Sequence, residues 1–179
     1  MNARVIVNSI TLSRIPLSLL FIIFFQPNIY FLYCALIICG VAFISDILDG
    51  FLARKFNIAS VHGRHWDSLG DKAFYIAVII SFNSHGLLEP IVCWGLLLRE
   101  VALYITRIWY IEKLEKLELI RPYTNWHGYF MYLTIILGFC NMYRNIYIGT
   151  YPLYLYIQIS AYIALLFGTA SIFKFLSIK

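Results

Sequence analysis

Charged residues are scarce in this sequence of 179 residues: only 13% are Asp, Glu, Lys or Arg, whereas 61% are hydrophobic. So little polar side-chain surface cannot coat a water-soluble protein of this size, which excludes an ordinary soluble enzyme. Hydrophobic runs recur along the whole length, so we expect no cleavable signal peptide followed by a soluble domain. The sequence instead predicts one integral membrane domain over residues 1–179.

Cysteine pairs with the spacing of a metal site or a disulfide framework are also missing. Every cysteine lies inside an apolar run: Cys34, Cys39, Cys93 and Cys140. Such positions are typical of small core residues, so we expect neither a disulfide-stapled fold nor a CxxC metal site.

Apolar stretches near the length of about 20 residues that a bilayer requires recur six times. We place them at 10–25, 30–47, 73–82 with its flanks, 91–108, 129–141 with its flanks, and 153–176. Turn and helix-ending residues separate them at 27–28, 83–90, 112–125 and 144–152. The prediction is an all-α fold of six transmembrane helices, with a short interfacial helix over 2–8 before them.

The formal net charge of +5 is explained by the distribution of Lys and Arg among the connections. Nearly all of them fall in the N-terminus, the 54–72 and 107–121 connections and the C-terminus, whereas the opposite loops hold only Arg144. Because positive loops stay on the cytosolic side, we expect both termini in the cytosol. The basic balance therefore gives no support to nucleic-acid binding, and it suits contact with anionic membrane lipids.

Four aspartates share one predicted depth at the cytosolic side of the membrane. Asp46 and Asp49 end the second span three residues apart, and Asp67 and Asp71 begin the third span four residues apart. Each pair therefore lies on one face of its helix. If these faces meet, four carboxylates converge, and hard oxygen ligands of this kind suit Mg²⁺, Mn²⁺ or Ca²⁺.

Two alternative roles are open for these acids. They can be capping and solvated residues at helix ends, or they can mark the ion path of a cation transporter or channel. A transporter should spread its acids through the membrane depth, whereas these four cluster beside Gly50, Ala53 and Arg54. The small residues clear one helix face, over which Arg54 either reaches a phosphate or extends to the interface.

The stretch that holds the aspartates resembles the CDP-alcohol phosphotransferase, or CDP-alcohol phosphatidyltransferase, family. Its signature, DxxDGxxAR, eight residues, then GxxxDxxxD, is matched at every fixed position: Asp46, Asp49, Gly50, Ala53, Arg54, Gly63, Asp67 and Asp71. A match of this length is far more specific than a single short motif.

The beginning of the chain extends the resemblance. The layout of six spans is closest to bacterial phosphatidylglycerophosphate synthases, as is the leading pattern of Asn8, Thr11 and Arg14. These three residues share a helix face, so they can help to hold the nucleotide. The alternative is a helix-capping region in which Arg14 snorkels to the membrane rim.

The resemblance implies roles for the signature residues. Asp46, Asp49 and Asp67 would be ligands of Mg²⁺ or Mn²⁺, as two ions, and Asp71 would lie close to them as the base that deprotonates the acceptor. The CDP pocket would be lined by Asn8, Thr11, Gly50, Ala53, Arg54 and Gly63. The alcohol oxygen would attack the phosphorus that carries the lipid of CDP-diacylglycerol, and CMP would leave. The resemblance also implies a homodimer in the bacterial inner membrane with its site facing the cytosol.

The acceptor is less closely specified. Arg99 and Glu100 lie within the fourth span, where the resemblance implies that Arg99 binds an acceptor phosphate, helped by Arg107 and Arg121; a buried structural pair is the alternative. The lysine-rich GKxKT-like stretch usual in phosphatidylglycerophosphate synthases is replaced by NWHGYFMYLT at 125–134. Gly128 remains, Tyr129 takes the place of the first lysine, and His127 or Arg121 can substitute for the lysines only in part.

Glycerol 3-phosphate is the leading acceptor, and inositol phosphate, serine, choline or another phosphatidyl lipid are the alternatives. A catalytically silent membrane scaffold is a further possibility. The retention of Asp71 argues against it, since a protein without chemistry has no need of the base.

Overall fold

The computed structural model describes residues 9, 12–55, 61–109, 114–147 and 152–177. All of its regular secondary structure in these ranges is helical, as the sequence predicts. The chain divides into two compact units, Met1–Ser81 and Phe82–Lys179. That both belong to one domain stays a prediction.

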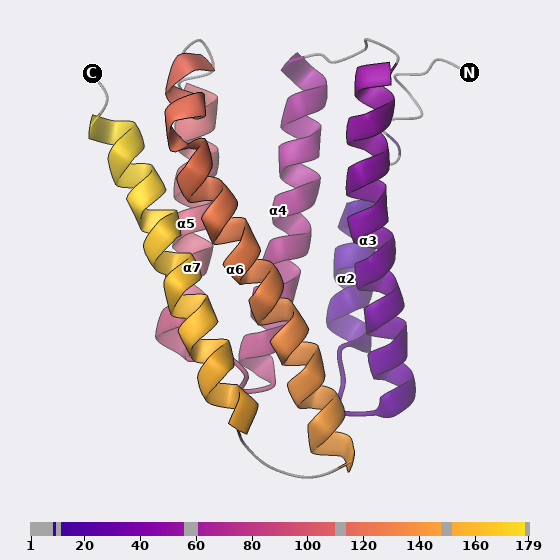
Figure 1. Cartoon of the computed structure of the whole chain (residues 1–179). Coiled ribbons are helices and arrows are strands. Elements are labelled where there is room, and N and C mark those ends of the chain that lie inside the picture. The colour runs from indigo at the N-terminus through magenta and orange to yellow at the C-terminus, as the bar shows by residue number, and fades with distance from the viewer. Residues whose placement is uncertain (1–8, 10–11, 56–60, 110–113, 148–151, 178–179) are drawn as a thin grey trace. The chain divides into compact units, whose positions relative to one another are not determined.

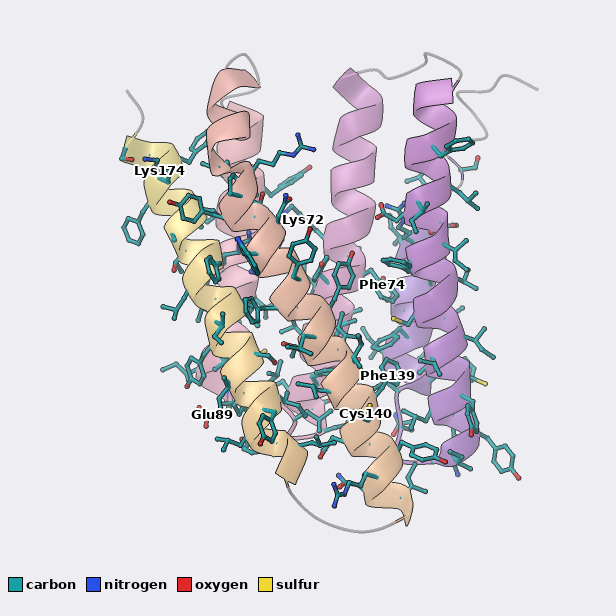
Figure 2. All side chains as sticks on the ribbon, in the orientation of Figure 1. Lys72, Phe74, Glu89, Phe139, Cys140 and Lys174 are labelled. Carbon is teal, nitrogen blue, oxygen red and sulfur yellow. The ribbon has the colours of Figure 1, made fainter. Side chains whose placement is uncertain are left out.

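The first unit contains α2 (Arg14–Phe24), α3 (Ile29–Lys55) and most of α4 (Val61–Ser84). The break between α2 and α3 falls at Pro27 and Asn28, and the Asn28 side chain caps α3 by accepting a hydrogen bond of 3.0 Å from the backbone N–H of Tyr30. α2 packs against α3 (Figure 1). The Phe21 ring of α2 also contacts Phe74 of α4 edge-on, with 5.4 Å between the ring centroids (Figure 2).

The second unit contains α5 (Pro90–Trp109), α6 (Leu114–Tyr147) and α7 (Pro152–Ser177). α7 packs along α6 and also against α5 (Figure 1). Buried polar side chains join these helices: Thr134 and Ser160 share a hydrogen bond of 2.8 Å between α6 and α7. The Gln158 amide of α7 holds the segment before α5, because it donates to the carbonyl of Leu87 and accepts from the N–H of Glu89.

The turn from α4 to α5 shows why the helices end where they do. Gly86 adopts a φ of 66°, and the N–H of Leu87 closes back on the carbonyl of Phe82 at 2.8 Å, as at the end of many helices. Pro90 then opens α5, at a position that needs no N–H donor. Glu89 accepts a hydrogen bond from the hydroxyl of Tyr162 in α7 (Figure 2).

Two of the predicted connections are wrong. The break expected at 112–125 is largely helical, because α6 begins at Leu114 and continues through Pro122. Leu, Glu and Lys residues before Pro122 favour the helix, which tolerates the loss of the one backbone hydrogen bond that proline cannot donate. The connection expected at 54–72 is also shorter, since α3 extends to Lys55 and α4 begins at Val61.

Two helical segments are long and apolar enough to cross a membrane, Ile29–Leu48 and Leu153–Ser177. On α3 many large apolar side chains are exposed, including Tyr30, Ile37 and Ile44, which a bilayer would cover. The six predicted spans correspond to the six helices of the described residues, but crossing by all six stays a prediction. The interfacial helix predicted over 2–8 lies outside the described residues.

Candidate functional site

The signature residues lie on two helices. α3 carries Asp46, Asp49, Gly50, Ala53 and Arg54, and α4 carries Gly63, Asp67 and Asp71. Because both segments are helical, each aspartate pair shares a helix face, as predicted. The connection expected around Gly63 is wrong: this glycine is the third residue of α4.

Among the four aspartates, the described side chains include only that of Asp46. The side chains of Asp49, Asp67, Asp71 and Arg54 lie outside the described part, so the convergence of the carboxylates stays a prediction. Asn8 and Thr11, expected in the CDP pocket, also lie outside the described residues.

Arg14 occupies an unexpected place beside this motif. Its side chain is buried against α3, where Nη2 lies 3.2 Å from Oδ1 of Asp46 and Nε donates a 3.2 Å hydrogen bond to Oγ of Ser45. The alternative of a snorkelling arginine at the membrane rim is therefore wrong for Arg14. Its burial follows from partners that satisfy the charge inside the helix pair.

The Asp46 carboxylate can bind a metal cation while it is paired with Arg14. The ion pair uses Oδ1, and 43% of the side chain stays exposed. Carboxylate oxygens are the donors that Mg²⁺ and Mn²⁺ prefer. The described side chains contain no group of three His, Cys, Asp or Glu residues that could hold a metal, and three of the four aspartates expected at the metal lie outside that set.

A second polar cluster is buried in the other unit, where Arg99, Glu100 and His127 meet. The Arg99 guanidinium donates from Nη1 to Oε1 of Glu100, and Nε2 of His127 lies 3.3 Å from the same oxygen. Nδ1 of His127 lies 2.8 Å from the carbonyl oxygen of Ala164. His127 of α6 therefore connects Glu100 of α5 with the backbone of α7.

One partner of His127 fixes a hydrogen on its ring. A carbonyl oxygen only accepts, so Nδ1 of His127, which lies against the Ala164 carbonyl, carries a hydrogen. Nε2 faces the Glu100 carboxylate, whose Oε1 is also paired with Arg99.

Gly168 of α7 leaves the space that Arg99 fills. A Cβ atom added at Gly168 would lie 2.7 Å from Nε of Arg99 and 3.1 Å from its Cδ and Cγ. Nε of Arg99 is buried, and within the described part of the chain it has no hydrogen-bond partner. Arg99 is thus a buried cation with a donor to spare.

The other expected acceptor residues are less defined. Arg107 lies in α5, but its side chain falls outside the described part. Arg121 is exposed on α6. The sequence pointed to His127 only in part, through its place in the 125–134 stretch that replaces the lysine-rich motif, and it gave no signal for Gly168.

Comparison with known proteins identifies a family and several similar bacterial proteins. A family model described as CDP-alcohol phosphatidyltransferase matches residues 4–173. A CDP-diacylglycerol--glycerol-3-phosphate 3-phosphatidyltransferase of Mycoplasma pneumoniae is 35% identical over 99 residues, which cover 53% of this chain and 42% of that protein.

This chain is also similar to proteins of the same name from two further bacteria. That of Aquifex aeolicus is 33% identical over 108 residues, covering 59% of this chain and 60% of its own length. That of Escherichia coli strain K12 is 28% identical over 106 residues, covering 58% of each chain. The matched part thus spans between 42% and 60% of these relatives.

Proposed function

This chain belongs to the CDP-alcohol phosphatidyltransferase family, and from that premise we propose that it makes phosphatidylglycerophosphate. The donor is CDP-diacylglycerol, the acceptor is glycerol 3-phosphate, and CMP is released. The observation that carries the proposal is the family match over 4–173, supported by relatives named as glycerol-3-phosphate 3-phosphatidyltransferases.

On the donor side, Asp46, Asp49 and Asp67 hold Mg²⁺ or Mn²⁺, as two ions, with Asp71 close to them. These ions supply the neutralisation of charge on the diphosphate. The residues around them bind the CDP moiety: Asn8, Thr11, Gly50, Ala53, Arg54 and Gly63. The salt bridge from Arg14 supports this arrangement, because it fixes the Asp46 carboxylate at one oxygen.

The reaction is a displacement at the phosphorus that carries the lipid. Asp71 accepts the proton of the acceptor hydroxyl, the oxygen forms a bond to phosphorus, and the bond between this phosphorus and the bridging oxygen breaks. The leaving group is CMP, which keeps the electron pair of that bond. A small residue at Gly50 leaves room for the nucleotide beside the aspartates.

The acceptor side is provided by Arg99, with Arg107 and Arg121. An anionic acceptor is favoured over serine or choline, because Arg99 is a buried cation whose Nε has no hydrogen-bond partner within the described part of the chain. Inositol phosphate would satisfy the same cation. The names of the relatives favour glycerol 3-phosphate.

The same proposal includes the setting of the enzyme. Six helices cross the bacterial inner membrane with both termini and the site in the cytosol, and the donor keeps its acyl chains in the lipid. The distribution of Lys and Arg supports this orientation. The protein acts as a homodimer.

An acceptor panel tests the proposal. Purified protein receives CDP-diacylglycerol, Mg²⁺ and one acceptor at a time, namely glycerol 3-phosphate, inositol phosphate, serine or choline, and the CMP released is measured. We expect release with glycerol 3-phosphate well above that of an Asp71→Asn variant. If no acceptor exceeds the variant, transferase activity is refuted; if only serine or choline works, the acceptor assignment is wrong.

A further inference from the structure

The end of α6 away from the predicted cytosolic side carries two polar side chains that the proposed reaction does not use. Arg144 is half-buried in the last turn of this helix, and its Nε is buried without a hydrogen-bond partner in the described part of the chain. Asn141, one turn earlier on the same helix face, is only 5% exposed, and its amide makes no hydrogen bond to a described residue. Buried polar groups without partners point to a missing ligand.

The depth of these residues in the membrane follows from the packing of α7 along α6 (Figure 1). Lys174, in the last turn of α7, marks the cytosolic end of the hydrocarbon layer, because a lysine keeps its ammonium group among the headgroups. Counting about 20 residues back along α7, at about 1.5 Å each, crosses a layer of about 30 Å and reaches Tyr154. Figure 2 shows Lys174 toward one end of this pair of helices and Cys140 toward the other.

The hydrogen bond between Thr134 and Ser160 relates this depth to α6. Tyr154 lies about 9 Å from Ser160 along α7. In the same direction along α6, Arg144 lies about 15 Å from Thr134, and Asn141 about 11 Å. Arg144 is therefore about 6 Å outside the hydrocarbon layer, and Asn141 about 2 Å outside it. The headgroup region extends about 5 to 7 Å beyond that layer, with the glycerol esters at its inner edge and the phosphates further out.

We infer that Arg144 and Asn141 bind one phospholipid of the outer leaflet, the guanidinium on its phosphate and the amide donating to an ester carbonyl. An anionic lipid is favoured, because Arg144 is the only Lys or Arg of the loops on this side and has no ion pair with a described acid. The exposed side chains of Tyr143 and Tyr156 nearby are typical of a membrane interface. The inference goes beyond the proposed reaction and rests only on the proposed setting, in which α6 crosses the membrane.

Charge alone gives Arg144 a simpler role, since a cation in the last turn of a helix favours the helix dipole. Lysine serves that role equally well, and Asn141 takes no part in it. A lipid phosphate, in contrast, accepts two hydrogen bonds from the guanidinium fork, which lysine cannot copy. The two roles therefore predict different results for Arg144→Lys and for Asn141→Leu.

Thermal unfolding in detergent measures the lipid site without catalysis. Dioctanoyl phosphatidylglycerol, added without divalent cations, should raise the Tm of the wild type, and its concentration dependence gives the affinity. We expect Arg144→Gln to weaken this affinity about tenfold or more, because a charge-assisted contact is lost. Arg144→Lys should lie between the two. Asn141→Leu should weaken the affinity about fivefold, since a neutral donor contributes less.

Two variants are matched controls. Lys174→Gln removes the same charge at the cytosolic end of α7, and Asn145→Leu removes an exposed amide one turn after Asn141. Both should keep an affinity close to that of the wild type. Inorganic phosphate and dioctanoyl phosphatidylcholine distinguish a free phosphate and a zwitterionic lipid from the anionic lipid, and each should stabilise the wild type less than phosphatidylglycerol does.

Several outcomes would overturn the inference. Wild-type affinity in Arg144→Lys and in Asn141→Leu would leave only the helix dipole. An equal loss in Lys174→Gln would mean a general attraction between a basic protein and an anionic lipid. Equal stabilisation by inorganic phosphate would assign the site to free phosphate, and equal stabilisation by phosphatidylcholine would contradict the preference for an anionic lipid. None of these measurements needs CMP release, so failure of the proposed reaction is distinguishable from failure of the lipid site.

Discussion

Replacement of Arg14 by methionine should weaken both the fold of the first unit and its affinity for divalent metal. Methionine keeps the apolar stem in place but removes the guanidinium, so at least two contacts are lost: the 3.2 Å ion pair with Asp46 and the 3.2 Å hydrogen bond to Ser45. Asp46 then retains its charge without the partner that fixes Oδ1.

The size of the effect follows from the exposure of each partner. Asp46 is 43% exposed, so solvent screens its charge and the ion pair contributes about 1 kcal/mol. The hydrogen bond to Ser45 contributes about 1 kcal/mol more. A total of about 2 kcal/mol corresponds to a fall in Tm of about 4 to 8 °C for a chain of this size. Loss of a group that orients a metal ligand typically weakens metal affinity by about 10- to 100-fold.

Two measurements check this prediction. Thermal unfolding in detergent gives the Tm, and titration with Mn²⁺ followed by electron paramagnetic resonance gives the metal affinity. Arg14→Lys should be intermediate, since one ammonium cannot make the same pair of contacts. Ser18→Ala is the matched control, because it removes a buried side-chain hydrogen bond within α2 and should leave Mn²⁺ affinity unchanged. Wild-type Mn²⁺ affinity in Arg14→Met would refute the role assigned to this arginine.

Three more predictions concern glycine packing and the metal. Gly138→Ala should lower stability by about 1 to 2 kcal/mol, because the new Cβ would overlap the Phe82 ring and the cost exceeds the gain in helix propensity; an unchanged Tm would contradict this. Gly168→Ala should displace Arg99 and raise KM for glycerol 3-phosphate about tenfold with kcat nearly unchanged, and initial rates over a range of acceptor concentrations measure it; a wild-type KM would disprove the close packing. Chelation with EDTA should abolish CMP release, and Mg²⁺ or Mn²⁺ should restore it; activity that survives chelation would rule out the metal proposal.

The helices were predictable because their signals are local. Apolar runs and the breaks at 27–28 and 83–90 gave the positions of α2 and α5 within a few residues, whereas α3 and α4 both extend into the connection expected at 54–72. The prediction failed at 112–125, where charged residues and Pro122 were taken for a connection although Leu and Glu favour a helix. A polar segment need not break a helix, and residues 114–125 are polar and helical at once.

The site was predictable where its motif is local in the sequence, and unpredictable where it depends on tertiary contacts. The signature around Asp46 and Asp49 could be read from spacing alone. The bond from Arg14 to Asp46 could not, since 32 positions separate these residues and only the packing of α2 on α3 joins them. The same holds for His127 with Glu100, and for Gly168, whose effect depends on the approach of α7 to Arg99.

The central claim is the transfer of a phosphatidyl group to glycerol 3-phosphate, and product analysis tests it most directly. Wild-type protein and Asp71→Asn are incubated with CDP-diacylglycerol, Mg²⁺ and isotopically labelled glycerol 3-phosphate, and the lipid product and CMP are quantified by mass spectrometry. We predict labelled phosphatidylglycerophosphate and CMP in equal amounts from the wild type and neither above background from the variant. CMP without labelled lipid, or no CMP at all, would contradict the account.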